Sequence, residues 1–406
     1  MKPLKNIFLI FFLFAAFQPL SAAENKKNSS VLDDVDRLIT QKQYQSAWTL
    51  LHDEAEDLDI SDMILKKTEL TLLYYAKTNL HQMFAFADLR ENEELSDIRG
   101  QEGSFDFKLY DPAGALTMVI KENPDRREAY YWLAEYYHQV MTLYGEEWEK
   151  PQEDIRSLVI ANFRMAAALG METEEIYSKL SYTELLSGSW EAAVEDLQKA
   201  LEYNNANPAY YHDLAIAHLN MKKNNEALSY IEKAINLYTD PFYKADSAFL
   251  ASTIALHLED SDKAESYLIK GGAFSPDDYR FPDRLIRLYL NKSDFVNARD
   301  AAGDLFAMYP ENPANCTTII QYFYSVGKLD ETSVFFKTQL EKYQGQAEIL
   351  GNLYFHKAIS ARYQGLNDEA LESFTVAETE FAKVYSRDNQ VFQAIEKMTA
   401  ELLPTE

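Results

Sequence analysis

The side chains best suited to catalysis or metal binding are few and scattered in this sequence. A zinc hydrolase needs an H-E-x-x-H pair, and a structural zinc site needs cysteines and histidines at short, regular spacings. The sequence has neither pattern, and it has no G-x-S-x-G and no phosphate-binding P-loop. We therefore expect no metal, no cofactor and no enzymatic activity. The residues considered were Cys316, His52, His81, His138, His212, His218, His257 and His356.

Three arginines at helical spacing are a better candidate for binding. Arg280, Arg284 and Arg287 share one predicted helix in a chain whose formal net charge is −26. They either contact an anion or an acidic peptide, or form ordinary surface ion pairs with nearby aspartates. Those aspartates are Asp277, Asp278 and Asp283.

A dense group of aromatic residues is the second candidate. It comprises Tyr130-Tyr131-Trp132 and Tyr136-Tyr137. Tyr131, with Glu135 and His138 on the same predicted helix face, is either an exposed binding anchor or a residue packed against a neighbouring helix. Exposed tyrosines are frequent anchors in binding surfaces.

The composition limits the class of protein. Hydrophobic residues make up 47 % of the chain, while glycine and proline number only 13 and 12. This is enough apolar material for a large core and argues against disorder. The strong negative charge disfavours nucleic acids and anionic membrane surfaces as partners.

The first 23 residues have the pattern of a secretory signal peptide. Lys2 and Lys5 precede an apolar run over 7–17, and Ser21-Ala22-Ala23 provides small side chains for cleavage. This run is too short to cross a bilayer, which takes about 20 residues. We expect cleavage after Ala23, a periplasmic or secreted product, and no stable membrane insertion. Since the only cysteine is far from the leader, we do not expect a lipoprotein.

A repeated pattern of small and apolar residues runs through the chain. After Gly188, the first copy has Ala193, Leu197 and Ala200, and the next begins 34 residues later at Ala227. Four strong copies that keep the same frame are difficult to explain by chance. The further copies are marked by Ala227, Ile231, Ala234; Ala264, Leu268, Gly271; Ala298, Ala302, Leu305; a weaker Gly327, Thr332, Phe336; and Gly365, Ala370, Phe374, Ala377.

These residues resemble the tetratricopeptide repeat (TPR) family. The resemblance implies an all-α fold, a right-handed superhelical solenoid of helix–turn–helix repeats in which each pair buries its apolar face on the next. It also implies that first helices line a concave groove, with Tyr131, Arg280 and Arg287 facing inward. Members that clamp a partner's terminal carboxylate use Lys and Asn where this chain has His212 and Ile216, so that clamp is not expected. His218 and Cys316 occupy packing positions of the family.

The expected organisation follows from these patterns. The signal peptide (1–23) and a mobile N-terminus (24–30) precede a divergent helical block (31–94) and a loop (95–110). The TPR array (111–385) follows, with an insertion at Tyr144–Pro151 and a capping helix in 386–406 that Asp388 or Asn389 can cap.

The leading hypothesis is an exported scaffold that binds a protein or peptide partner in its groove. The alternative is a solute-binding or transporter-associated component that encloses a small ligand. A deep pore lined by aromatic residues and arginine favours the alternative, and an open groove favours the scaffold.

Overall fold

The computed structural model describes residues 28–53 and 58–402, and within them the chain forms α-helices α1–α20 and a small β-sheet. The chain divides into two compact units, unit 1 up to Glu172 and unit 2 from Thr173. The predicted signal peptide lies outside the described residues. Helix α1 begins at Asn28, within the segment that was expected to be mobile. No helix of the described residues combines the length and the apolar character that crossing a bilayer requires.

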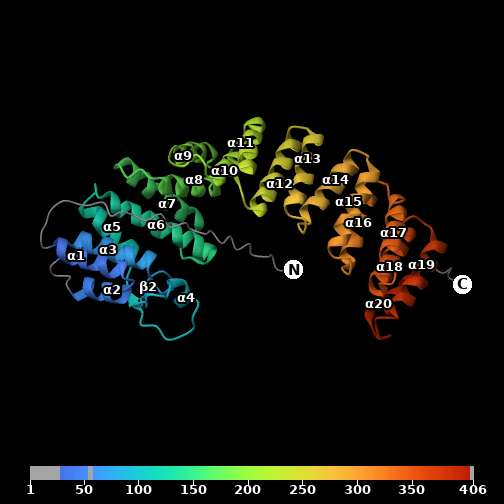
Figure 1. The fold of residues 1–406 in the computed structure, drawn as a ribbon, viewed down its shortest axis with the longest axis horizontal. Coiled ribbons are helices and arrows are strands. Elements are labelled where there is room, and N and C mark those ends of the chain that lie inside the picture. The colour runs from blue at the N-terminus through green and yellow to red at the C-terminus, as the bar shows by residue number, and fades with distance from the viewer. Residues whose placement is uncertain (1–27, 54–57, 403–406) are drawn as a thin grey trace. The chain divides into compact units, whose positions relative to one another are not determined.

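Unit 2 is built from helix pairs that follow one another along the chain (Figure 1). Each first helix packs on its own second helix and, from α10 on, also on the second helix of the preceding pair. The first helices are α8 (Glu174–Leu186), α10 (Pro208–Asn220), α12 (Pro241–His257), α14 (Arg280–Asn291), α16 (Pro313–Ser325) and α18 (Ala347–Tyr363). The second helices are α9 (Trp190–Tyr203), α11 (Asn224–Leu237), α13 (Ser261–Phe274), α15 (Phe295–Met308), α17 (Glu331–Lys342) and α19 (Asn367–Phe381).

One turn geometry joins the two helices of every pair in unit 2. The second residue after each first helix has a positive φ, and the next backbone N–H donates to a carbonyl in the last turn of that helix, at 2.8–3.0 Å. This is the Schellman ending, which favours glycine because other residues are strained there. Glycine occupies only half of these positions, so glycine alone does not mark every turn in the sequence. The positions are Gly188, Lys222, Glu259, Ser293, Gly327 and Gly365.

The small residues of the repeat lie where the helices of a pair meet. Ala193, Ala227, Ala264 and Ala298 are fully buried, and the large side chains around them fill the space between helices. Small residues let helices approach closely. The prediction of stacked helix pairs is confirmed for this part of the chain.

The predicted capping helix is present as α20 (Gln390–Ala400). The side chain of Asn389 accepts a hydrogen bond from the Val391 N–H at 3.0 Å, so Asn389 rather than Asp388 is the N-cap. Phe392 and Ile395 are buried against the preceding pair. The helix therefore covers the apolar face that the last pair would otherwise expose.

Unit 1 also contains helix pairs. Lys42 has a positive φ and joins α1 to α2 by the Schellman turn seen in unit 2. Ala47 and Leu51 of α2 are fully buried, as a TPR-like second helix requires. The helices of unit 1 are α1 (Asn28–Thr40), α2 (Tyr44–Asp53), α3 (Ile60–Leu73), α4 (Leu95–Arg99), α5 (Pro112–Glu122), α6 (Arg127–Tyr144) and α7 (Gln152–Ala168), with a short 3-10 turn, η2 (Gly145–Glu147), after α6.

A three-stranded antiparallel sheet in unit 1 was not predicted. Strands β1 (Lys77–Asn79) and β2 (Met83–Ala85) form a hairpin, and β3 (Lys108–Leu109) pairs with β2. The expectation of an all-helical block over 31–94 was therefore wrong for the hairpin, and that of a loop over 95–110 was wrong for β3 and for α4. These strands are too short to show a period-2 pattern.

The hairpin turn of this sheet has an unusual sequence. Three residues, Leu80, His81 and Gln82, lie between the paired Asn79 and Met83, and Leu80 and His81 both have positive φ, where Asn and Gly are the favoured residues. The turn buries the His81 ring against Tyr136 and Phe84, and burial lowers its pKa to about 4. His81 Nε2 lies 3.1 Å from Gln139 Oε1 on α6. The strained turn thus places His81 in contact with α6 and packs the sheet against that helix.

Candidate functional site

The three candidate residues of unit 1 are buried. Tyr131, Glu135 and His138 on α6 are at most 8 % exposed. The Tyr131 ring lies 6.0 Å from the Phe163 ring of α7, and Glu135 accepts a hydrogen bond from Gln139 Nε2 at 3.2 Å. The structure thus matches the packing alternative for Tyr131. Any role of these residues in partner binding stays a prediction.

The three arginines of unit 2 lie in a network that crosses four consecutive first helices. We call this network the arginine face. It consists of His212 on α10, Asp246 and Phe249 on α12, Arg280, Asp283, Arg284 and Arg287 on α14, Tyr322 on α16, and Asp278 just before α14.

Arg280 is held by carboxylates on two sides. Its Nη1 donates to Asp246 Oδ1 at 2.9 Å, and its Nη2 donates to Asp278 Oδ2 at 2.8 Å. Its guanidinium also lies 5.0 Å from the Phe249 ring centroid. These contacts neutralise Arg280 and fix its position between two repeats.

Arg287 is paired in a similar way. Its Nε lies 3.2 Å from Asp283 Oδ2, and its Nη2 donates to the Tyr322 hydroxyl at 2.8 Å. The Tyr322 hydroxyl in turn donates to Asp283. Arg280 and Arg287 therefore form ion pairs with nearby aspartates, which is the second of the two alternatives given above.

Arg284 differs from its two neighbours. Its guanidinium lies 5.0 Å from the Phe249 ring centroid, and it forms no ion pair with a carboxylate of the described residues. A guanidinium on an aromatic ring keeps its charge and its hydrogen-bond donors. Arg284 is therefore the cation of the arginine face that remains available to an outside acceptor.

His212 extends the network to α10. Its ring nitrogens lie 3.7 Å from Asp213 Oδ1 and from Asp246 Oδ2, which is too far for hydrogen bonds but close enough for electrostatic attraction. Burial lowers the pKa of His212, but the two carboxylates outweigh burial and raise the pKa to about 9. The imidazole is therefore charged at neutral pH.

This shift predicts a pH dependence of stability. The pKa of His212 in the folded chain, about 9, lies above the ordinary value of 6.5. The stabilisation is thus complete below pH 6.5 and is lost as the pH rises through 9. Its upper bound is about 3 kcal/mol. Urea unfolding at pH 6 and pH 9.5 should show a loss of about 1–3 kcal/mol in the native chain that His212→Gln does not show. An identical pH dependence in both chains would exclude this role.

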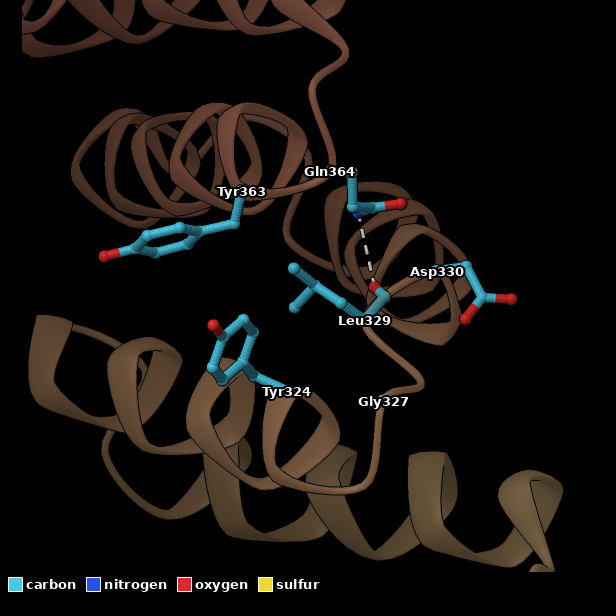
Figure 2. A pocket seen from close by; sticks show the side chains of 6 residues that line it. All are labelled: Tyr324, Gly327, Leu329, Asp330, Tyr363 and Gln364. Atoms are coloured by element: carbon cyan, nitrogen blue, oxygen red, sulfur yellow. Dashed lines mark hydrogen bonds between the residues drawn. The ribbon is translucent and has the colours of Figure 1, made fainter.

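A small pocket lies between the ends of α16 and α18 (Figure 2). Its volume is about 380 Å3, and the rings of Tyr324 and Tyr363, whose centroids are 5.9 Å apart, lie on one side of it with Leu329 beside them. The two tyrosines are 63 % and 66 % exposed, which is high for large aromatic side chains. Gln364 Nε2 donates to the Leu329 carbonyl at 3.3 Å, while Asp330 points away. The exposed parts of the two tyrosine rings offer an aromatic surface to an apolar or proline side chain.

Sequence reasoning did not identify His212, Asp246, Phe249 and Tyr322 as members of the network. A signal was present, because Asp246 follows His212 by one repeat of 34 residues and Arg280 follows Asp246 by another. Equivalent positions of consecutive repeats are neighbours in a solenoid. Charges of opposite sign separated by one repeat period therefore predict these ion pairs.

Two further candidates for chemistry, Cys316 and His218, are packing residues. Cys316 is fully buried, and burial raises the pKa of its thiol to about 12. His218 is buried, with its ring 5.1 Å from the Tyr230 ring. Both packing predictions are confirmed. Within the part of the chain that the structure describes, no group of three or more histidine, cysteine or carboxylate side chains is arranged to hold a metal ion.

Comparison with known proteins gives a local match. Residues 182–222, which span the end of α8, all of α9 and α10, match the family model described as TPR repeat. No curated protein sequence matches the chain.

Solved structures resemble the chain at low sequence identity. A tetratricopeptide repeat protein from Parabacteroides merdae is 12 % identical, with 67 % of this chain and 98 % of that one covered and a TM-score of 0.40. YrrB, described as a TPR protein with an unusual peptide-binding site, is 15 % identical, with coverages of 52 % and 97 % and a TM-score of 0.39. PilF of Pseudomonas aeruginosa is 15 % identical, with coverages of 54 % and 96 % and a TM-score of 0.38. Such TM-scores are too low to assign a function to this chain.

Proposed function

We propose that this chain is an exported, non-catalytic scaffold that holds a protein or peptide partner on the arginine face of unit 2. The observation that carries the proposal is Arg284, a cation stacked on Phe249 without a carboxylate partner among the described residues. Arg280 and Arg287 on the same helix have such partners. A surface on which the neighbouring arginines are paired and one arginine is free of carboxylates can bind a carboxylate of a partner.

The chemistry of the surface supports a peptide rather than a small solute. Arg284 lies on a face that extends over α10, α12, α14 and α16, so that an extended segment meets several first helices in turn. Tyr324 and Tyr363 add a second contact for an apolar side chain. Aromatic and arginine side chains carry much of the affinity in protein interfaces.

The proposal of export rests on the leader. Lys2, Lys5, the apolar run 7–17 and Ser21-Ala22-Ala23 have the order of a signal peptide. The mature chain then acts in the periplasm or outside the cell. Its single cysteine, Cys316, is buried and free, so the fold does not depend on an internal disulfide in such a compartment.

Photo-crosslinking tests where the partner binds. The substitution Asn291→p-benzoylphenylalanine, two turns after Arg284 on the same side of α14, keeps Arg284 in place in the exported full-length chain, and Lys337→p-benzoylphenylalanine serves as its control. Lys337 is exposed on α17, a second helix. We expect a discrete adduct from position 291 and none from position 337. Adducts of equal yield from both positions, or an adduct from 337 alone, would contradict the proposal.

A further inference from the structure

The insertion between α6 and α7 forms one wall of a second pocket, which lies within unit 1. The pocket has a volume of about 310 Å3. The start of α5 forms another wall, and two tyrosines of α6 line it as well. The side chains that matter for its chemistry are Asp111, Tyr136, Tyr137, Trp148, Glu149 and Lys150.

The insertion is fixed on the end of α6. The side chain of Gln152 is buried and donates a hydrogen bond to the Gly145 carbonyl, which closes the loop. The rings of Trp148 and Tyr144 lie 4.9 Å apart. Trp148 is therefore held in place as a wall of the pocket before any ligand arrives.

The two tyrosines that line the pocket are buried and lack partners. Tyr136 and Tyr137 are 2 % and 9 % exposed, and their rings are in edge contact at 5.3 Å. Neither hydroxyl forms a hydrogen bond with another of the described residues. The hydroxyl oxygens themselves are not fully enclosed by protein, so they reach the open part of the pocket. A ligand that donates hydrogen bonds would satisfy both.

The charge at the pocket is negative where the tyrosines lie. Asp111 and Glu149 line the pocket, and neither forms an ion pair with another described residue. Asp111 Oδ1 also accepts from the Gly114 N–H at 3.1 Å, which caps α5 and offsets the positive end of that helix. Burial, and then these two carboxylates, raise the pKa of Tyr136 and of Tyr137. Lys150 also lines the pocket, and both Glu149 and Lys150 are exposed to solvent.

We propose that this pocket binds an alkylammonium or guanidinium group, such as the side-chain cation of lysine or arginine. The indole of Trp148 attracts such a cation through its ring face. Asp111 and Glu149 supply the opposite charge, and the hydroxyls of Tyr136 and Tyr137 accept N–H hydrogen bonds. A lysine ammonium donates three hydrogen bonds and accepts none, which suits this set of acceptors.

Calorimetric titration of the full chain tests the proposal. The probes are Nα-acetyl-lysine amide, Nα-acetyl-arginine amide, the uncharged norleucine analogue and Nα-acetyl-glutamate amide. We expect saturable binding of the two cations with a Kd of about 1 mM or tighter. The norleucine and glutamate probes should bind at least about 10-fold more weakly. Absence of saturation with both cations, or a preference for glutamate, would overturn the proposal.

Paired substitutions locate the binding in this pocket. Asp111→Asn with Glu149→Gln removes both charges, and asparagine still caps α5. We expect this double variant to weaken binding of the lysine probe at least about 10-fold, with an unchanged circular dichroism spectrum. Glu146→Gln, an exposed carboxylate of the same insertion outside the pocket, should leave affinity unchanged. Equal affinities of all three chains would overturn the assignment.

A further titration distinguishes a cation that belongs to a protein segment from a free small-molecule cation. A glycine-rich peptide with one central lysine is compared with Nα-acetyl-lysine amide. Tighter binding of the peptide assigns the site to a lysine of a protein segment, and equal binding assigns it to a free cation. Either result supports the same cation chemistry, and failure of both probes overturns it.

Discussion

Phe306→Ala is expected to lower the free energy of unfolding of unit 2 by about 3–5 kcal/mol. Phe306 on α15 is fully buried, and its ring lies 6.1 Å from Phe335 and 5.5 Å from Tyr343. These contacts join α15 to α17 and to the residue that follows α17, in the next pair. Removal of the ring leaves a cavity between pairs, and a solenoid has few distant contacts with which to compensate.

Urea unfolding and hydrogen exchange measure this effect. We expect amide protection to fall mainly in α14–α18, whose side chains share one core cluster with Phe306. Phe242→Ala is the control, because Phe242 is 61 % exposed and its removal should change stability by less than about 0.5 kcal/mol. Similar losses in the two variants would contradict the description of this core.

The sequence was sufficient to predict the helix pairs of unit 2. The repeat of small residues, 34 positions apart between Ala193 and Ala227, predicts that Ala264 and Ala298 also lie in the core, and all four are buried. The turn position was harder to recognise, since Lys222, Glu259 and Ser293 accept a backbone strain that glycine would avoid. Glycine therefore marks only half of these turns, at Gly188, Gly327 and Gly365.

Unit 1 was harder to predict for two physical reasons. The turn at Leu80 and His81 carries none of the usual turn residues, so local sequence did not reveal the hairpin. Helix α6 is covered on several sides, and its pattern of aromatic residues did not distinguish a core tyrosine from an exposed one. Tyr131 was therefore left with two interpretations that only its burial could separate.

The arginine face was partly predictable. The spacing of Arg280, Arg284 and Arg287 places them along one helix, but it does not show which of them is neutralised. That depends on Asp246 and Tyr322, which lie one repeat before and one repeat after α14. The ion pairs of Arg280 and Arg287 therefore leave Arg284 as the arginine of α14 that can bind a partner, and the proposed function depends on it.

Arg284→Glu is expected to weaken partner binding at least about 30-fold, or about 2 kcal/mol. The substitution removes the available cation and places a carboxylate near Asp283 and Asp246, where an acidic group of a partner would be repelled. Phe249 would also lose its cation contact with residue 284 while keeping that with Arg280. The lost contact with the Phe249 ring should lower the free energy of unfolding by about 0.5–1 kcal/mol, and no ion pair of Arg284 is lost among the described residues.

The most direct test is the Kd of the photo-crosslinked partner, measured with the purified native chain, Arg284→Glu and Lys337→Glu. The two variants change the charge equally, but Lys337 lies on the second helix α17, away from the arginine face. We predict that Arg284→Glu raises the Kd at least about 30-fold and that Lys337→Glu leaves it within about 2-fold. An unchanged Kd for Arg284→Glu, or an equal rise for both variants, would contradict binding at the arginine face.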